Sequence, residues 1–301
     1  MRLVTIDDGC PMCRRAGLLT ERGIVDLTKA WPKMSGEGSP RSVLDILREG
    51  LLGELAALNL KKLPEEALLP SATPLWAPVD RPGKVLALGL NFKSHAEENK
   101  KPLPKIPIIF SKATTALNSA TGDIVIPPGT SQVDWEVELC LVVGRRARRV
   151  SPDQAMDYVA GFTVMNDVSA RDWQFAVSQW HRAKSADTFA PLGPALVTLD
   201  EASPEWGSNL RDGWPKLRLL CRVNGETLQD CLVGDDIIFG PAEVLSFISG
   251  SETLEAGDCI SLGTPAGVGY YRRPQRYLKA GDVVECEIPG LGCLRNRVAA
   301  E

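Results

Sequence analysis

Short apolar runs separated by Gly and Pro dominate the chain from Lys84 onward. Runs of this kind bounded by turn residues are typical of strands, and few stretches carry the period of a long helix. We therefore expect an α+β fold that is mostly β. The expected strands are Val85–Leu90, Ile106–Phe110, Ile124–Ile126, Val137–Val143, Phe162–Met165, Leu217–Val223, Cys259–Leu262 and Val283–Ile288.

The N-terminal region has a different texture. Leu3–Ile6 is predicted to be a strand, and Thr20–Gly23 the turn of a hairpin. A helix should follow, with Ser39 as its cap and Pro40 in its first turn. Its apolar stripe would be formed by Val43, Leu44, Ile46, Leu47 and Leu51.

Prolines at positions 64, 70, 74, 78 and 82 interrupt any regular element between these two regions. We expect a linker or an extended crossover there, with a domain boundary near residue 80. The predicted organisation is a small N-terminal α/β domain over residues 1–75 and a larger domain over residues 80–301.

Composition indicates a globular protein that acts on a small molecule. The 34 basic and 38 acidic residues give a net charge of -4, so no positive excess attracts nucleic acid or anionic lipid. The dense basic run Arg145–Arg149 is a solvated turn or, alternatively, a polyanion site. No stretch approaches the roughly 18 apolar residues that span a membrane, and the acidic start does not resemble a secretory signal. A cytoplasmic location is expected.

The chain has eight cysteines, and most should be free thiols in a reducing compartment. Cys10 and Cys13 form a CxxC motif, which has three possible interpretations: a redox-active pair, half of a zinc site, or a pair of thiols without function. No second CxxC and no neighbouring His completes a tetrahedral zinc site, so no function is assigned to the pair.

Two carboxylates alternate along the strand that begins near Trp135. Glu136 and Glu138 would lie on one face of it, about 7 Å apart along the strand. A solvated face is the ordinary interpretation, but the apolar run that follows Leu139 favours a buried strand. Asp167, at the end of the apolar strand Phe162–Met165, is either a third carboxylate of this group or a turn residue. Three carboxylates without Cys or His would suit Mg²⁺ or Mn²⁺ better than zinc.

His95 lies three residues before Glu98, just after a predicted strand. On one helical turn, this spacing lets a carboxylate orient an imidazole as a general base. An exposed polar helix start is the alternative. Lys184 begins a segment rich in small residues, where it could bind a carboxylate, and Thr264 lies in a Gly-rich turn suited to an anion.

Five segments follow one another in a specific order: Gly89–His95, Asp134–Leu139, Asn166–Asp172, Lys184–Phe189 and Gly263–Gly269. Their succession resembles the catalytic domain of the fumarylacetoacetate hydrolase family. The resemblance covers roughly residues 80–298, and residues 1–70 are similar to the small N-terminal domain of many members.

The resemblance implies a β-roll-like catalytic fold and a homodimer. It implies that Glu136, Glu138 and Asp167 bind Mg²⁺ or Mn²⁺, and that His95 and Glu98 activate water on a mobile lid. Substrate-positioning roles would fall to Lys184, Arg171, Gln174 and Thr264.

We accordingly expect a metal-dependent hydrolase that cleaves a C–C bond in a small 2-oxo acid of the acylpyruvate type, as in aromatic compound catabolism. Isomerisation of a hydroxymuconate-type diacid, decarboxylation of oxaloacetate and lyase chemistry on a sugar-derived acid are open alternatives. A non-catalytic binder of small acids is another, although all five acid–base positions are filled. Arg272, Arg273 and Arg276 either favour a second substrate carboxylate or belong to a solvated loop.

Overall fold

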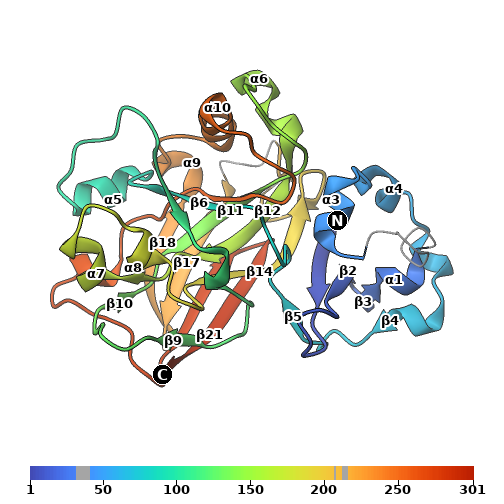
Figure 1. The fold of residues 1–301 in the computed structure, drawn as a ribbon, viewed down its shortest axis with the longest axis horizontal. Coiled ribbons are helices and arrows are strands. Elements are labelled where there is room, and N and C mark those ends of the chain that lie inside the picture. The colour runs from blue at the N-terminus through green and yellow to red at the C-terminus, as the bar shows by residue number, and fades with distance from the viewer. Residues whose placement is uncertain (32–40, 207, 212–215) are drawn as a thin grey trace.

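The computed structural model describes residues 1–31, 41–206, 208–211 and 216–301. Its largest feature is a 12-stranded sheet that extends across the molecule (Figure 1). Short strands β5 (Leu75–Trp76) and β8 (Leu117–Asn118) pair with β1 and β14 at its side. The main path runs β4 (Leu68–Leu69), β3 (Gly23–Asp26), β2 (Arg15–Thr20), β1 (Arg2–Ile6), β14 (Ala190–Thr198), β12 (Val159–Asn166), β11 (Val137–Val143), β19 (Cys259–Ser261), β6 (Val85–Gly89) and β7 (Ile108–Lys112).

A five-stranded sheet packs against the centre of the large one. Alternate residues of β11 face opposite sides, as a strand requires. Leu139 joins a hydrophobic core with Leu219 of the second sheet, whereas Cys140 joins the core on the other side. Because β11 is buried on both faces, its sequence is almost continuously apolar. The second sheet runs β18 (Glu226–Leu232), β17 (Arg218–Val223), β20 (Val283–Ile288), β21 (Gly292–Ala300) and β9 (Ile124–Ile126).

The N-terminal strands extend the large sheet. β1 pairs antiparallel with β14, with Leu3 opposite Leu196. Leu3 also belongs to the same apolar cluster as Ile46, Val85 and Met165. Residues before and after position 80 are therefore joined by backbone hydrogen bonds and by a shared core.

The helices are short, and Figure 1 shows most of them at the edges of the molecule, around the strands. In α3, Ser42 and Asp45 form a reciprocal capping box, whereas Ser39 and Pro40 lie outside the described residues. Within the described ranges, no helix is long and apolar enough to cross a membrane. The helices are α1 (Leu27–Ala30), α3 (Val43–Arg48), α4 (Leu52–Ala56), α5 (Lys93–Glu98), α6 (Pro152–Ala155), α7 (Arg171–Ala176), α8 (His181–Lys184), α9 (Val233–Asp236) and α10 (Pro241–Ser251).

The mostly β, α+β prediction is confirmed, and each expected strand is present with small changes at its ends. The strand β12 begins three residues earlier than expected, and β7 begins and ends two residues later than expected, so that β7 includes Lys112. The sequence pattern does not predict β14, because Gly193 and the prolines on either side of it are typical of turns. A glycine at position 161 of β12 allows the close approach of β14, since a Cβ there would lie 2.0 Å from the Val197 carbonyl oxygen.

The basic run Arg145–Arg149 has structural partners. Arg148 donates hydrogen bonds to the carbonyl oxygens of Ser249 and Gly250 at the end of α10. The Arg145 guanidinium lies over the ring of Tyr158, 4.2 Å from its centroid. These contacts, together with the exposure of Arg145, Arg146, Arg148 and Arg149, support the interpretation of the run as a solvated turn.

Candidate active site

The pairing of β11 with β12 brings three carboxylates together. Val137 is opposite Asn166 in this antiparallel ladder, so Glu136 is opposite Asp167, whose backbone N–H donates to the Glu136 carbonyl oxygen. Directly opposed residues project to the same face, and Glu138 shares that face with Glu136. The carboxylates of Glu136, Glu138 and Asp167 are buried, with one oxygen of each within 4.8 Å of the others.

Buried cations compensate two of these carboxylates. The Lys184 Nζ lies 2.6 Å from Glu136 Oε2 and 2.6 Å from Asp167 Oδ2. Lys112, from the end of β7, donates to the other Asp167 oxygen. Arg171 contacts the second Glu136 oxygen at 2.7 Å. Burial opposes ionisation of Glu136, but Lys184 and Arg171 nevertheless hold its pKa well below the usual range.

Glu138 has a different environment. Its Oε2 accepts hydrogen bonds from the Ser261 hydroxyl at 2.5 Å and from the Gly263 N–H at 3.0 Å, both neutral donors. Burial, reinforced by the nearby charges of Asp167 and Glu136, raises the pKa of Glu138 well above its usual value. Among the residues that the structure describes, no cation forms an ion pair with this carboxylate.

The predicted pair on α5 makes direct contact. His95 Nδ1 lies 2.6 Å from Glu98 Oε1, and the second Glu98 oxygen accepts a hydrogen bond from the Gly267 N–H at 3.0 Å. Gly267 has a φ of +107°, and a Cβ there would lie 2.2 Å from the Leu228 carbonyl oxygen, so this turn requires glycine. Because a carboxylate can only accept, the proton of neutral His95 is expected on Nδ1, which leaves Nε2 as its basic atom.

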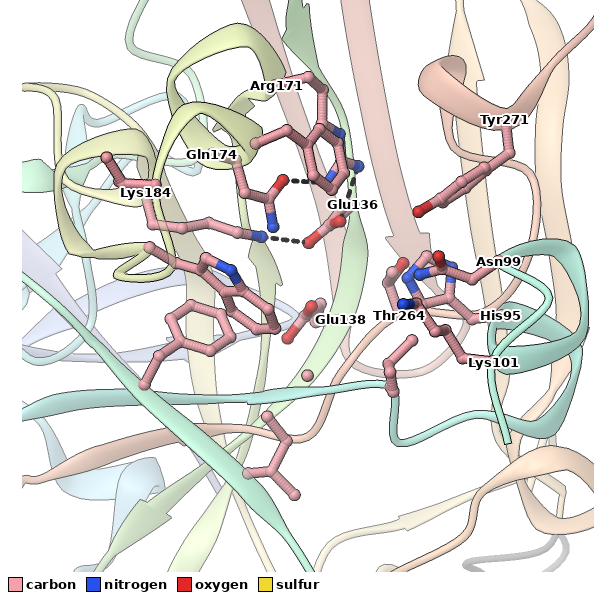
Figure 2. A pocket seen from close by; sticks show the side chains of 17 residues that line it. His95, Asn99, Lys101, Glu136, Glu138, Arg171, Gln174, Lys184, Thr264 and Tyr271 are labelled. Carbon is pink, nitrogen blue, oxygen red and sulfur yellow. Dashed lines mark hydrogen bonds and ion pairs between the residues drawn. The ribbon is translucent and has the colours of Figure 1, made fainter. Parts of the chain in front are cut away.

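A cavity of about 250 Å³ separates the His95 side from the carboxylate side (Figure 2). Glu136, Glu138, Arg171, Gln174, Lys184 and Thr264 line it together with His95, whereas Asp167 and Glu98 lie behind this wall. Leu88, Phe110, Val177 and Trp180 form an apolar part of the lining. The structure thus gathers all nine predicted site residues around one cavity, seven in direct contact with it.

The substrate-positioning candidates are held by buried polar contacts. Arg171 donates to Asp134 at 2.8 Å and to the amide oxygen of Gln174 at 2.8 Å. The Thr264 hydroxyl donates to the Val137 carbonyl oxygen and accepts a hydrogen bond from Gln229. Because the Gln174 oxygen is engaged by Arg171, its NH₂ group is left as a donor for the cavity.

Cys10 and Cys13 lie in the turn between β1 and β2, away from the cavity. Both are free thiols, with their sulfur atoms 2.6 Å apart. Over the described residues, Glu136, Glu138 and Asp167 form the one group of three potential metal ligands, so no zinc site forms around this pair.

The family model of the fumarylacetoacetate (FAA) hydrolase C-terminal domain matches residues 84–299. The chain belongs to the fumarylacetoacetate hydrolase family. The resemblance seen in the sequence is thereby confirmed, and the matched range includes every residue described around the cavity.

Relatives in this family have several named activities. The chain is 40% identical over 284 residues to the mitochondrial oxaloacetate tautomerase FAHD2A of Bos taurus, covering 92% of this chain and 84% of the relative. Fumarylacetoacetate hydrolase from Exiguobacterium antarcticum is 31% identical over all of both chains, with a TM-score of 0.82. The 5-carboxymethyl-2-hydroxymuconate delta-isomerase from Mycobacterium smegmatis is 28% identical, with a TM-score of 0.73, over 100% of this chain and 99% of that one. The chain is therefore an enzyme of this family.

Three polar residues of the site were missed in the sequence. Lys112 lies beyond the end of the strand that the sequence predicts, and its ion pair with Asp167 links positions 55 residues apart. Asp134 accepts from the N–H groups of Gly269 and Tyr270 as well as from Arg171. Gln229 lies on β18, a strand that the apolar pattern did not reveal. For Asp134, its position close to Glu136 and Glu138 in the sequence is a signal that could have indicated a place in the site.

Proposed function

We propose that this enzyme is a keto–enol tautomerase for a small 2-oxo acid of the oxaloacetate kind and that it works with Mg²⁺ or Mn²⁺. One observation carries the proposal: the basic His95 Nε2 faces a cluster of carboxylates and cations across a single small cavity. The 40% identity to an oxaloacetate tautomerase over most of both chains supports the choice of reaction.

The donor set fits a hard divalent cation. Glu136, Glu138 and Asp167 offer only oxygen atoms, which Mg²⁺ and Mn²⁺ prefer. Glu138 accepts hydrogen bonds from neutral donors and has a raised pKa, so a bound divalent cation would stabilise its ionised form. Held by these three residues, the metal would act as a Lewis acid toward the 2-oxo group of the substrate.

The protein's own cations would bind the acid end of the substrate. Asp167 and Glu136 raise the pKa of Lys184 despite its burial, so its ammonium remains charged. Arg171 is fixed by Asp134 and Glu136, and it orients Gln174 beside the cavity. A substrate carboxylate and a developing negative charge on the 2-oxygen would be stabilised at this end.

His95 would move the proton. In the keto form, Nε2 takes a proton from C3, the electron pair of that C–H bond forms the C2–C3 double bond, and negative charge develops on the 2-oxygen. The same imidazolium then returns the proton to that oxygen, which gives the enol, and the reverse sequence gives the keto acid. Glu98 accepts the Nδ1–H throughout and stabilises the imidazolium, and no water is consumed.

The test is to add enol oxaloacetate from dry solvent and follow the loss of the enol absorbance in the ultraviolet. We expect the protein to accelerate this loss with Mg²⁺ or Mn²⁺, and we expect EDTA and Glu136→Gln to abolish the acceleration. A rate equal to that of buffer alone would refute the proposal. Pyruvate and CO₂ assays in the same mixtures would detect decarboxylation.

Hydrolysis of an acylpyruvate is a second candidate. The apolar lining formed by Leu88, Phe110, Val177 and Trp180 favours it, because these side chains could bury an acyl tail. In this reaction His95 Nε2 would take a proton from water as the water attacks the distal carbonyl. The bond between that carbonyl carbon and C3 would then break, its electron pair would form the enolate of pyruvate, and the imidazolium would return the proton to C3, which gives pyruvate and a carboxylic acid. Release of pyruvate from an acylpyruvate, without acceleration of enol loss from oxaloacetate, would favour this candidate over the first.

We also propose a homodimer, as the family resemblance implies. Light scattering of the purified protein should give twice the mass of the chain, and the mass of a single chain would refute this.

A further inference from the structure

Lys101 follows the helix that carries His95, and its backbone is fixed by the end of that helix. The Lys100 N–H donates to the Glu97 carbonyl oxygen at 2.9 Å, and the Lys101 N–H donates to Ala96 at 3.0 Å. Lys100 has a φ of +53°, so the two bonds form a Schellman motif with a left-handed residue after the cap. Lys101 is therefore held in a defined place relative to His95.

Of the described cationic side chains that line the cavity, Lys184 and Arg171 form ion pairs with carboxylates and Lys101 does not. Lys184 contacts Glu136 and Asp167, and Arg171 contacts Asp134 and Glu136. Lys101 also lines the cavity, but nowhere in the described chain does its side chain have a hydrogen-bond or ion-pair partner. Its side chain is exposed, so its ammonium is accessible to a ligand.

The three arginines that the sequence offered for a second carboxylate do not line the cavity. Arg276 pairs with Glu226 at 2.5 Å, and Arg272 and Arg273 donate to backbone carbonyl oxygens. They are engaged elsewhere, which leaves Lys101 as the remaining candidate among the described cations around the cavity.

Lys101 lies on the opposite side of the cavity from Lys184. Figure 2 shows Lys101 and Asn99 beside His95, facing the group formed by Glu136, Lys184 and Gln174. A small acid whose 2-oxo end lies against Lys184 would extend past His95 toward Lys101. An anionic group at its far end would then meet an unpaired ammonium.

We infer that Lys101 binds the second carboxylate of a dicarboxylate substrate and so determines specificity for diacids. The inference rests on the proposed function only for the placement of the 2-oxo end at the carboxylate cluster. A monoacid with an apolar tail would gain nothing from Lys101.

The test measures binding, without turnover, to the Mg²⁺-loaded enzyme by calorimetry. The probes are malate and 2-hydroxybutyrate, which have the same carbon skeleton but differ in a terminal carboxylate against a methyl group. Lys101→Gln should weaken malate binding by roughly five- to tenfold and leave 2-hydroxybutyrate within twofold. Lys101→Arg should restore much of the preference, and added salt should reduce it in the wild type.

Lys100→Gln is the matched control, because it removes the same charge from the neighbouring residue, which does not line the cavity. It should leave both affinities unchanged. Equal losses for both probes in Lys101→Gln, or a wild type without preference for malate, would overturn the inference. Tautomerase activity is measured separately: a Lys101-dependent preference in a protein that does not accelerate enol loss would refute the reaction and leave the diacid site standing.

Discussion

Glu98→Gln is a sharp test of the proton-transfer role, because the structure gives this side chain two partners that both donate. Its oxygens accept from His95 Nδ1 at 2.6 Å and from the Gly267 N–H at 3.0 Å. A glutamine has the same shape but offers one acceptor and one donor group. One of the two contacts must therefore become unfavourable.

The two orientations of the amide differ in cost. If its NH₂ group faces the Gly267 N–H, a partly buried donor loses its acceptor, which costs about 1–3 kcal/mol. If instead its NH₂ group faces His95, the imidazole must carry its proton on Nε2. The second orientation should be favoured by roughly 5- to 150-fold, and in it His95 has no basic atom toward the substrate.

We expect kcat for enol loss to fall by about 10²-fold or more in Glu98→Gln, since general-base catalysis contributes roughly 10²–10⁴-fold. Metal affinity should not change, because Glu98 is not one of the three clustered carboxylates and instead contacts His95 and the Gly267 N–H. Glu97→Gln, an exposed neighbour with the same change of charge, should retain full activity. A kcat for Glu98→Gln within about threefold of the wild type would show that the pair is not the proton-transfer group.

Further predictions concern the metal site and stability. Because the pKa of Glu138 is raised, metal binding must displace its proton, so Mn²⁺ affinity measured by electron paramagnetic resonance should increase with pH. Glu138→Gln should weaken this binding by roughly 100-fold and remove the pH dependence, and an unchanged affinity would exclude Glu138 as a ligand. Lys112→Met removes one of the two buried cations that contact Asp167, while Lys184 remains, and should lower the free energy of unfolding by about 1.5–3 kcal/mol in urea; an unchanged free energy would contradict this. Lys100→Gly should raise the melting temperature, because glycine relieves a left-handed conformation that costs about 1 kcal/mol; a lower melting temperature would contradict it.

Much of the catalytic framework follows from local sequence periodicity. The two-residue period of a strand places Glu136 and Glu138 on one face, and the helical turn places Glu98 against His95. The apolar runs likewise indicate the positions of strands such as β11, because a strand buried on both faces must be apolar nearly throughout. These features depend only on residues close together in the chain.

Tertiary structure alone decided the electrostatics. The register of β11 against β12 sets Asp167 opposite Glu136. The strand β7 extends to Lys112, which contacts the Asp167 carboxylate. The Gly267 N–H that fixes Glu98 lies 169 residues away along the chain. The sequence shows which charges exist, whereas strand pairing and burial determine which of them neutralise one another. Across the described ranges, this pairing leaves Glu138 without a cation and Lys101 without an anion, because charge compensation depends on distance in space.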